Sequence, residues 1–155
     1  MRMPFETTLF QLAQAFLWPV TMMVLAVFVY AVMALGAFGV EWLRRRKHPG
    51  AVLVLARHAN ASPERLELAV LKELEGLRLC SRVAPMLGLV ATMIPMGPAL
   101  VAVASGQSSG VAESLAPAFA AVIVALVAAS ITFVVYSVRR RWLLAEMLTV
   151  LDAAP

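Results

Sequence analysis

The sequence predicts an all-α integral membrane protein with three transmembrane helices and one amphipathic helix outside the membrane. Of its 155 residues, 62% are hydrophobic and 14% are charged, with a mean hydropathy of +0.87. A soluble domain is about half apolar and a quarter charged. Residues 7–40, 83–112 and 114–138 contain no Asp, Glu, Lys or Arg, and each window exceeds the roughly 20 residues needed to cross a bilayer. An ordinary soluble protein is therefore excluded, and residues 1–155 form a single membrane domain.

The basic residues predict the orientation of the spans. All Lys and Arg except Arg2 lie after the first span, before the second or after the third. The clusters that directly follow a span are Arg44, Arg45, Arg46 and Lys47, and Arg139, Arg140 and Arg141. Because cytoplasmic flanks collect Lys and Arg, we expect an external N-terminus and a cytoplasmic C-terminus. The positive charge then sets topology, and no nucleic-acid partner is expected.

These windows and the basic clusters define the expected segments. We place the spans at residues 17–40, 83–104 and 114–138, a cytoplasmic segment at 44–82, an external loop at 105–113 and a cytoplasmic tail at 139–155. The first apolar stretch is too long for a signal peptide, and its basic cluster follows rather than precedes it. Trp18 and Trp42 lie near its two ends, as interfacial aromatic residues do.

The first span is rich in Val, Met, Phe and Leu, a composition typical of a helix that faces membrane lipid. Spans two and three instead carry stripes of small residues, which allow helices in a membrane to approach closely. The first stripe comprises Ala84, Gly88 and Thr92, and the second comprises Ala118, Ala121, Ala125, Ala128 and Thr132. The second span also contains Pro85, Pro95 and Pro98, each of which removes a backbone donor and is expected to interrupt or bend the helix.

The cytoplasmic segment contains a strong helix start at residue 62. Ser62 can serve as the N-cap, with Pro63 at the first helical position and Glu64 in the first turn. Apolar residues then recur at helical spacing, at Leu66, Ala69, Val70, Leu74 and Leu77. We expect this amphipathic helix to run on into the second span. Its apolar face must be covered, either by the tail at residues 142–151 or by a second copy.

No pattern of catalytic residues is present, so the chain is not expected to be an enzyme or to bind a cofactor or metal. His48 and His58 lack metal-ligand spacing, and no phosphate-binding glycine loop occurs. Ion-coupled carriers usually hold a carboxylate or histidine within the membrane, but no span here contains one. If an ion is moved, a second protein must supply the acidic group.

Two polar residues leave alternatives open. Glu113 begins the third span next to the external loop, where it is either a solvated first-turn carboxylate or a point at which ions enter. The hydroxyl of Thr92 either donates a hydrogen bond to a backbone carbonyl of its own helix or lines a pore. Neither residue identifies a function alone.

The stretch from Arg82 to Leu100, RVAPMLGLVATMIPMGPAL, resembles the second-span signature of the MotA/TolQ/ExbB proton channel family. In that signature, Ala-Pro-x-Leu-Gly-Leu-x-Gly-Thr begins the span. The matching positions are Ala84, Pro85, Leu87, Gly88, Leu89 and Thr92. The family also shares the expected layout of three spans, with a cytoplasmic segment between the first two.

The resemblance implies a prokaryotic cytoplasmic (inner) membrane and a homo-oligomeric ring, a pentamer, around a dimer of a single-span partner. Each partner helix would carry a membrane Asp that transfers the proton, and ion flow would drive mechanical work. Here the glycine before the threonine is Ala91. The threonine expected in the third span is replaced by alanine at either candidate position, Ala118 or Ala121.

The leading hypothesis is therefore a proton-conducting, stator-like subunit. Its ion path would be lined by Thr92, Gly88, Ala84, Ala118, Ala121, Ala125 and Thr132. The missing third-span hydroxyl favours an alternative, a non-conducting oligomeric membrane scaffold of the same fold. A self-contained exporter would need its own membrane carboxylate, and Glu113 at the edge of a span is the sole candidate.

Overall fold

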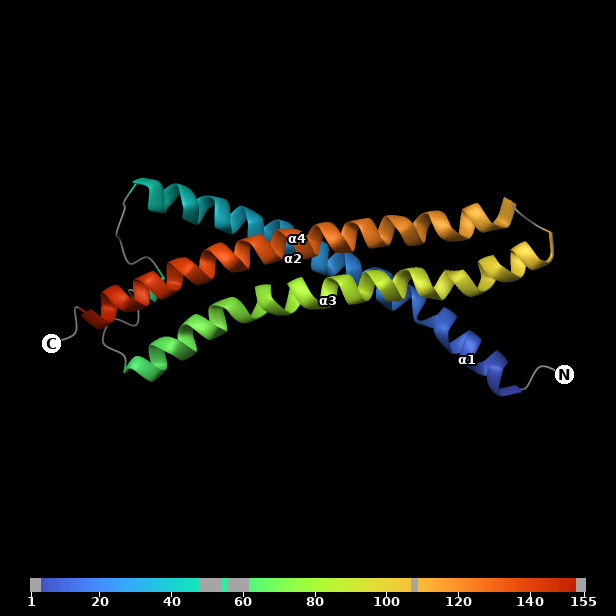
Figure 1. Cartoon of the computed structure of the whole chain (residues 1–155), viewed down its shortest axis with the longest axis horizontal. Coiled ribbons are helices and arrows are strands. Elements are labelled where there is room, and N and C mark those ends of the chain that lie inside the picture. Colours follow the sequence, from blue (N-terminus) through green and yellow to red (C-terminus); the bar gives the residue numbers. More distant parts are fainter. Residues whose placement is uncertain (1–3, 48–53, 56–61, 107–108, 153–155) are drawn as a thin grey trace. The chain divides into compact units, whose positions relative to one another are not determined.

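The described residues form four helices in the order α1 (Pro4–Ala15), α2 (Leu17–Lys47), α3 (Pro63–Ala104) and α4 (Ser109–Asp152) (Figure 1). This computed structural model describes residues 4–47, 54–55, 62–106 and 109–152, and these residues contain no strand. Three stretches, Thr8–Lys47, Pro63–Ala104 and Val111–Asp152, are long and apolar enough to cross a membrane. The predicted all-α, multi-pass membrane class is confirmed.

The chain divides into two compact units. The first unit comprises Met1–Tyr30 and Arg82–Ala129, and the second comprises Ala31–Ser81 and Ser130–Pro155. Helices α2, α3 and α4 each contribute one part to each unit. Most of the second and third spans falls in the first unit, and both basic clusters fall in the second.

A turn at Phe16 separates α1 from α2, so α1 is a helix that the sequence analysis did not anticipate. The Phe16 amide donates to the carbonyls of Leu12 and Ala13, at 3.3 and 3.1 Å. Pro19 has no amide hydrogen, so the carbonyl of Ala15, four residues earlier, loses its helical donor. This loss coincides with the end of α1 at Ala15.

Helix α3 runs without a break from outside the predicted membrane region into the second span, as predicted. Its first turn closes on the carbonyl of Ser62, which accepts from the amides of Arg65 and Leu66 at 2.9 and 3.1 Å. Pro63 occupies the first helical position, where a missing amide hydrogen costs nothing. Pro85, Pro95 and Pro98 all lie inside the helix, so they do not interrupt it.

The connection between α3 and α4 is shorter than the predicted loop. Gly106 adopts φ +76°, a backbone conformation that glycine enters without steric cost, and its amide donates to the carbonyl of Val103 at 3.1 Å. Helix α4 then begins at Ser109, ahead of the predicted span at residue 114. Absence of charge marks the apolar core of a span, and a helix can extend beyond that core.

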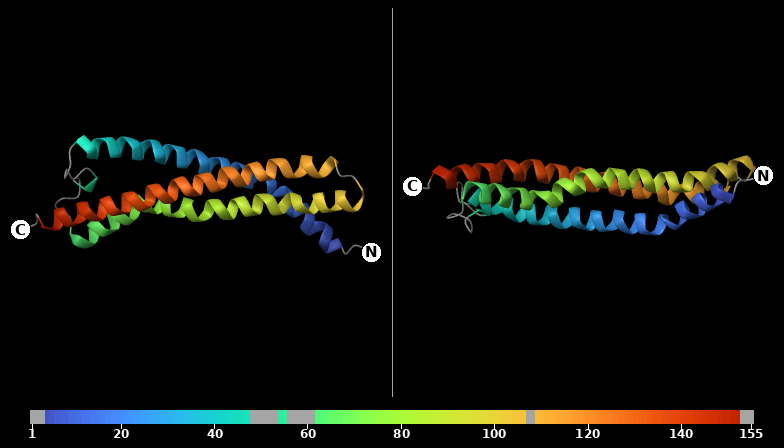
Figure 2. Two further views of the ribbon diagram at one scale, coloured as in Figure 1. Left: turned by 45° about the horizontal axis from the view of Figure 1, so that its top comes forward. Right: turned by 90° about the horizontal axis from the view of Figure 1, so that it is seen from below.

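The second unit has a leucine-rich core in which the start of α3 packs against the end of α4 (Figure 2). The buried cluster comprises Leu55, Leu66, Val70, Leu74, Leu143 and Val150. Burial of each such side chain stabilises the fold by roughly 1.5–3 kcal/mol. The prediction that the amphipathic helix packs on the tail is therefore confirmed within a single chain.

Candidate functional site

Helices α3 and α4 approach each other closely in the first unit at Gly88, inside the sequence motif. A Cβ atom built on Gly88 would lie 3.0 Å from the Cβ of Ala125 and 3.5 Å from the Cα of Val122. A methyl group at this position would require Ala125 to move by a few tenths of an ångström. The glycine of the motif is thus explained by packing, as expected for small residues at a membrane helix interface.

Most of the predicted pore-lining residues are covered by the chain itself. Ala84, Gly88, Ala118, Ala125 and Thr132 are all buried, Thr132 completely. A channel formed among several subunits must be lined by surface that a single chain leaves exposed. The small-residue stripes therefore serve first as contacts within one subunit.

Thr92 and Ala121 differ from the other members of the stripes because both are partly exposed. The Thr92 hydroxyl donates to the carbonyl of Leu89 at 2.8 Å, so the first of its two possible roles, a bond within its own helix, is observed. A hydroxyl oxygen that donates in this way can still accept a bond from water or from a partner. Glu113 is exposed, one turn into α4.

Helix α1 supplies a polar contact to the proline-containing part of α3. Pro98 lacks an amide hydrogen, which leaves the carbonyl of Ile94, four residues earlier, without its helical donor. The side-chain amide of Gln14 donates to that carbonyl at 3.3 Å. A freed carbonyl in a membrane helix must find such a partner, so Gln14 compensates for Pro98.

Gly97 allows α1 to approach α3 at the same place. A Cβ atom on Gly97 would lie 3.0 Å from the Cε2 atom of Phe10. The Gln14 hydrogen bond and the Phe10 contact therefore act together to dock α1 on the C-terminal half of α3. Sequence analysis missed this contact, although an amide in a charge-free window and a glycine next to a proline were signals that it could have used.

The residues of the two basic clusters separate into two groups in the second unit. Arg45 and Arg139 are half-buried and ion-paired, whereas Arg44, Arg46, Lys47, Arg140 and Arg141 are exposed. Arg45 donates to Glu41 at 2.7 Å, and Arg139 donates to the other Glu41 oxygen at 2.9 Å. Arg139 also lies 3.6 Å from Glu73. Two of the residues expected to set topology therefore also tie α2, α3 and α4 together.

Glu146 is the buried end of this set of charges and is only 5% exposed. One carboxylate oxygen accepts from Arg45, and the other accepts from the backbone amides of Val54 and Leu55, each at 3.1 Å. We call Glu41, Arg45, Glu73, Arg139 and Glu146 the basic-end network. Its carboxylates and guanidiniums satisfy one another, which offsets the cost of removing charge from water.

An aromatic pair completes this region. The rings of Phe38 and Trp142 stack with centroids 5.2 Å apart, and the Arg45 guanidinium lies 4.8 Å from the centre of the Trp142 ring. Cation–π contact of this kind stabilises an arginine by roughly 0.5–2 kcal/mol. The guanidinium of Arg45 is thus fixed by two carboxylates and one ring.

No cluster of metal-ligating side chains occurs among the described residues. His48 and His58, whose spacing in the sequence does not fit a metal site, lie outside the residues that the structure describes. The described first unit offers a closely packed helix pair, the half-buried hydroxyl of Thr92 and a docked N-terminal helix.

Comparison with known families identifies a match over most of the chain. The sequence profile of the MotA/TolQ/ExbB proton channel family matches residues 51–150, which is most of the chain and includes the Ala84–Thr92 motif. No curated protein and no solved structure matched the chain.

Proposed function

Because this chain belongs to the MotA/TolQ/ExbB proton channel family, we propose that it is a proton-conducting, stator-like membrane subunit. It would couple the transmembrane ion gradient to mechanical work through a separate single-span partner. The observation that carries the proposal is the combination of this family with three spans that contain no carboxylate or histidine. Such a subunit can provide the walls of a path and a ring, but it needs a proton carrier from another chain.

The partner in this proposal is a dimer of a single-span protein with an Asp in its span. A ring of subunits, a homopentamer, would surround the two partner helices in a prokaryotic inner membrane. The N-terminus would lie outside and the basic clusters on the cytoplasmic side. The exposed apolar residues of the spans, such as Met86 and Leu89, would face lipid, a neighbouring subunit or the partner.

Within this proposal, Thr92 is the pore hydroxyl and Ala121 is the adjacent wall. These two retain exposed surface in the single chain, which a shared path requires. The buried Ala84, Gly88, Ala118, Ala125 and Thr132 would instead hold the helices at the spacing that positions Thr92. Glu113 would attract cations where α4 begins.

A non-conducting scaffold of the same fold is the second candidate. It is favoured by the alanines at 118 and 121 and by the use of the Thr92 proton within α3. Particle images of a ring whose centre is filled with lipid and holds no partner helix would support the scaffold.

The test is proton flux into vesicles that contain the full chain co-expressed with the single-span product of a neighbouring reading frame. We expect flux with the wild-type chain and a reduction of at least tenfold with Thr92→Val, which keeps the side-chain shape and removes the hydroxyl. Thr149→Val, in the tail, is the matched control and should leave flux unchanged. Unchanged flux with Thr92→Val would remove Thr92 from the path, and no flux with any candidate partner would favour the scaffold.

A further inference from the structure

The three charge-free windows do not end at the same height along the helices. The first window ends at residue 40 and the third at residue 138, and the residues that follow them, Glu41 and Arg139, pair at 2.9 Å. Arg139 also lies 3.6 Å from Glu73, so Glu73 marks this height on α3. The second window begins only at residue 83, which is about 15 Å further along α3.

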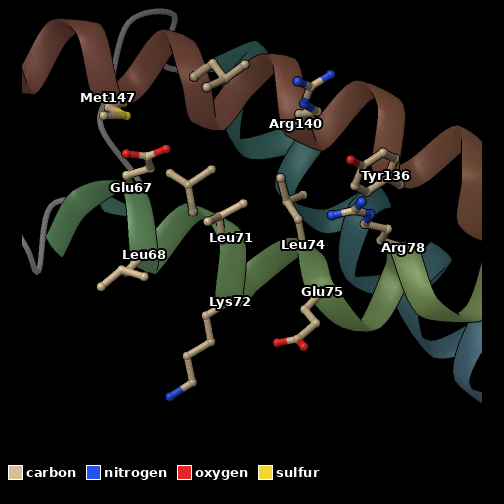
Figure 3. Close-up of a pocket in the computed structure, with 12 residues that line it drawn as sticks. Glu67, Leu68, Leu71, Lys72, Leu74, Glu75, Arg78, Tyr136, Arg140 and Met147 are labelled. Carbon is tan, nitrogen blue, oxygen red and sulfur yellow. The ribbon is translucent and has the colours of Figure 1, made fainter. Parts of the chain in front are cut away.

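Charged residues of α3 occupy the interval between these two heights. Glu75, Arg78 and Arg82 are all exposed, and Figure 3 shows Glu75 extending from α3 away from α4. If the hydrocarbon began at the height of Glu41, these three charges would lie within it, which is costly. If the hydrocarbon begins near Arg82 instead, no charged residue of α3 enters it, because residues 83–104 contain none.

Helix lengths and the division into units agree with a boundary near Arg82. Residues 83–104 of α3 rise about 33 Å, enough to cross the roughly 30 Å hydrocarbon core. The same height on α4 falls near residue 130, and residues 114–130 still reach the minimum of about 17 residues for a span. The second unit begins at Ala31 and Ser130 and ends on α3 at Ser81, so its contacts stop at this height.

The parts of α2 and α4 that this boundary leaves outside the hydrocarbon carry large exposed apolar side chains. They fall within residues 31–40 and 130–138, which contain no charge and belong to the second unit. An exposed apolar patch of this kind in water marks a site of contact with another protein. We call these side chains, each at least 45% exposed, the apolar belt: Met33, Leu35 and Val40 on α2, and Phe133 and Val134 on α4.

A second copy of the chain is the partner that fits the apolar belt. Copies in one membrane share the orientation that their basic residues set, so the belt lies at the same height in each copy and no charge has to leave water. A contact between the α2 face of one copy and the α4 face of the next joins different surfaces, and such contacts can close into a ring. The internal stretches 48–53 and 56–61, outside the described residues, are too short to cover both faces.

We propose that the hydrocarbon begins near Arg82 rather than at Glu41, and that the α2 face of the apolar belt packs against the α4 face of the next subunit. Burial of the belt removes large apolar side chains from water, so this contact stabilises the ring outside the lipid. The inference rests on the ring of the proposed function and does not depend on proton conduction.

The test is cross-linking in native membranes between two differently tagged copies of the full chain, both carrying Cys80→Ala. One copy carries Leu35→Cys and the other Val134→Cys, and a flexible bis-maleimide joins thiols that lie close together. We expect a cross-linked product that contains both tags. The matched control replaces Val134→Cys with Ile123→Cys, which is similarly exposed on α4 but lies within the span, and should give no product above background.

Second positions keep this test decisive if one cysteine variant does not fold or is badly oriented. Met33→Cys and Phe133→Cys give three further pairs, and failure of all four pairs to cross-link would overturn the proposal. Cross-linking of Val134→Cys to the same position in another copy would indicate a two-fold contact and would overturn the ring contact. A product with an unrelated protein in place of a second copy would also overturn it.

A spin label measures the boundary itself. A label at Ile123→Cys should be relaxed by oxygen dissolved in lipid, whereas a label at Val134→Cys should be shielded from both oxygen and an aqueous nickel chelate. Equal oxygen relaxation at the two positions would put the belt in lipid, and nickel relaxation at Val134→Cys would leave it bare in water. Either result would overturn the proposal.

Proton flux with the single-span partner separates this inference from the proposed function. Cross-linking without flux would support the contact between copies and count against conduction alone. Flux without cross-linking would overturn the contact and leave conduction in place.

Discussion

The two units of this chain are stabilised differently, although the same helices, α3 and α4, supply both. In the first unit their described contact is made by Gly88 and Ala125, at the limit of close approach. In the second unit they pack through leucines, as at Leu74 and Leu143, and are tied by ion pairs through Arg139. The packing changes where the charge-free windows predict that the surroundings of the helices change from lipid to water.

This difference has a physical cause. Lipid is as apolar as leucine, so burying leucine between helices in a membrane gains little, and close contact of small residues is what stabilises the pair. Outside the membrane, burial of large apolar side chains is favourable because it removes them from water. Oppositely charged side chains can also pair there, because water screens their attraction only in part. The comparison predicts that different kinds of substitution will harm the two units.

The largest expected effect is loss of the buried carboxylate in the second unit. Glu146→Ala should lower the free energy of unfolding by about 3 kcal/mol, because the amides of Val54 and Leu55 lose their acceptor. Arg45 keeps Glu41 as a partner, which limits the cost. The measurement is the midpoint of unfolding by sodium dodecyl sulfate in mild detergent.

Glu75→Ala is the control for this change, since Glu75 is exposed on α3 and should cost less than about 0.5 kcal/mol. If both alanine variants unfold at the same midpoint, the basic-end network contributes no stability and the contrast between the units is lost.

The next effect concerns the close helix contact in the first unit. Gly88→Ala should destabilise by about 1–3 kcal/mol, since its Cβ would lie 3.0 Å from that of Ala125. Gly39→Ala is the matched comparison, because nothing lies within 4 Å of a Cβ added there and alanine favours the helix. A lower free energy of unfolding for Gly88→Ala together with a higher one for Gly39→Ala would support the tight contact at Gly88. A stabilised Gly88→Ala protein would refute it.

The smallest effect is expected at the docked N-terminal helix. Gln14→Leu removes the donor to the Ile94 carbonyl and should cost about 0.6–2 kcal/mol, the range for polar contacts between membrane helices. Gln11→Leu, on the exposed face of α1, is the control and should be neutral. Isotope-edited infrared spectroscopy of the Ile94 carbonyl gives a second measurement, and an unchanged stretching frequency in Gln14→Leu would contradict the bond.

Local patterns predicted much of the fold and the contacts between distant residues were harder to foresee. The charge windows and the spacing of Leu66, Val70 and Leu74 depend on nearby residues, so they predicted the spans, the long α3 and its packing on the tail. The bonds from Gln14 to Ile94 and from Leu55 to Glu146 join residues 80 and 91 positions apart. No local pattern determines such pairs.

The candidate site shows the same division. The spacing of small residues indicated that α3 and α4 would pack closely against something, but it did not say whether the contact lay within one chain or around a pore. Burial of Ala84, Ala118 and Ala125 within one chain leaves Thr92 and Ala121 as the stripe residues with surface for a partner. The role of Thr92 in conduction stays a prediction.

The central claim is that this chain supplies the walls of an ion path and another chain supplies the acid. It is tested most directly by proton flux into vesicles that contain the purified chain alone, compared with vesicles that contain the chain and its single-span partner. The account predicts no flux above that of empty vesicles for the chain alone, and flux when the partner is present. Proton flux through the chain alone would contradict it, because a path would then exist without the partner's carboxylate.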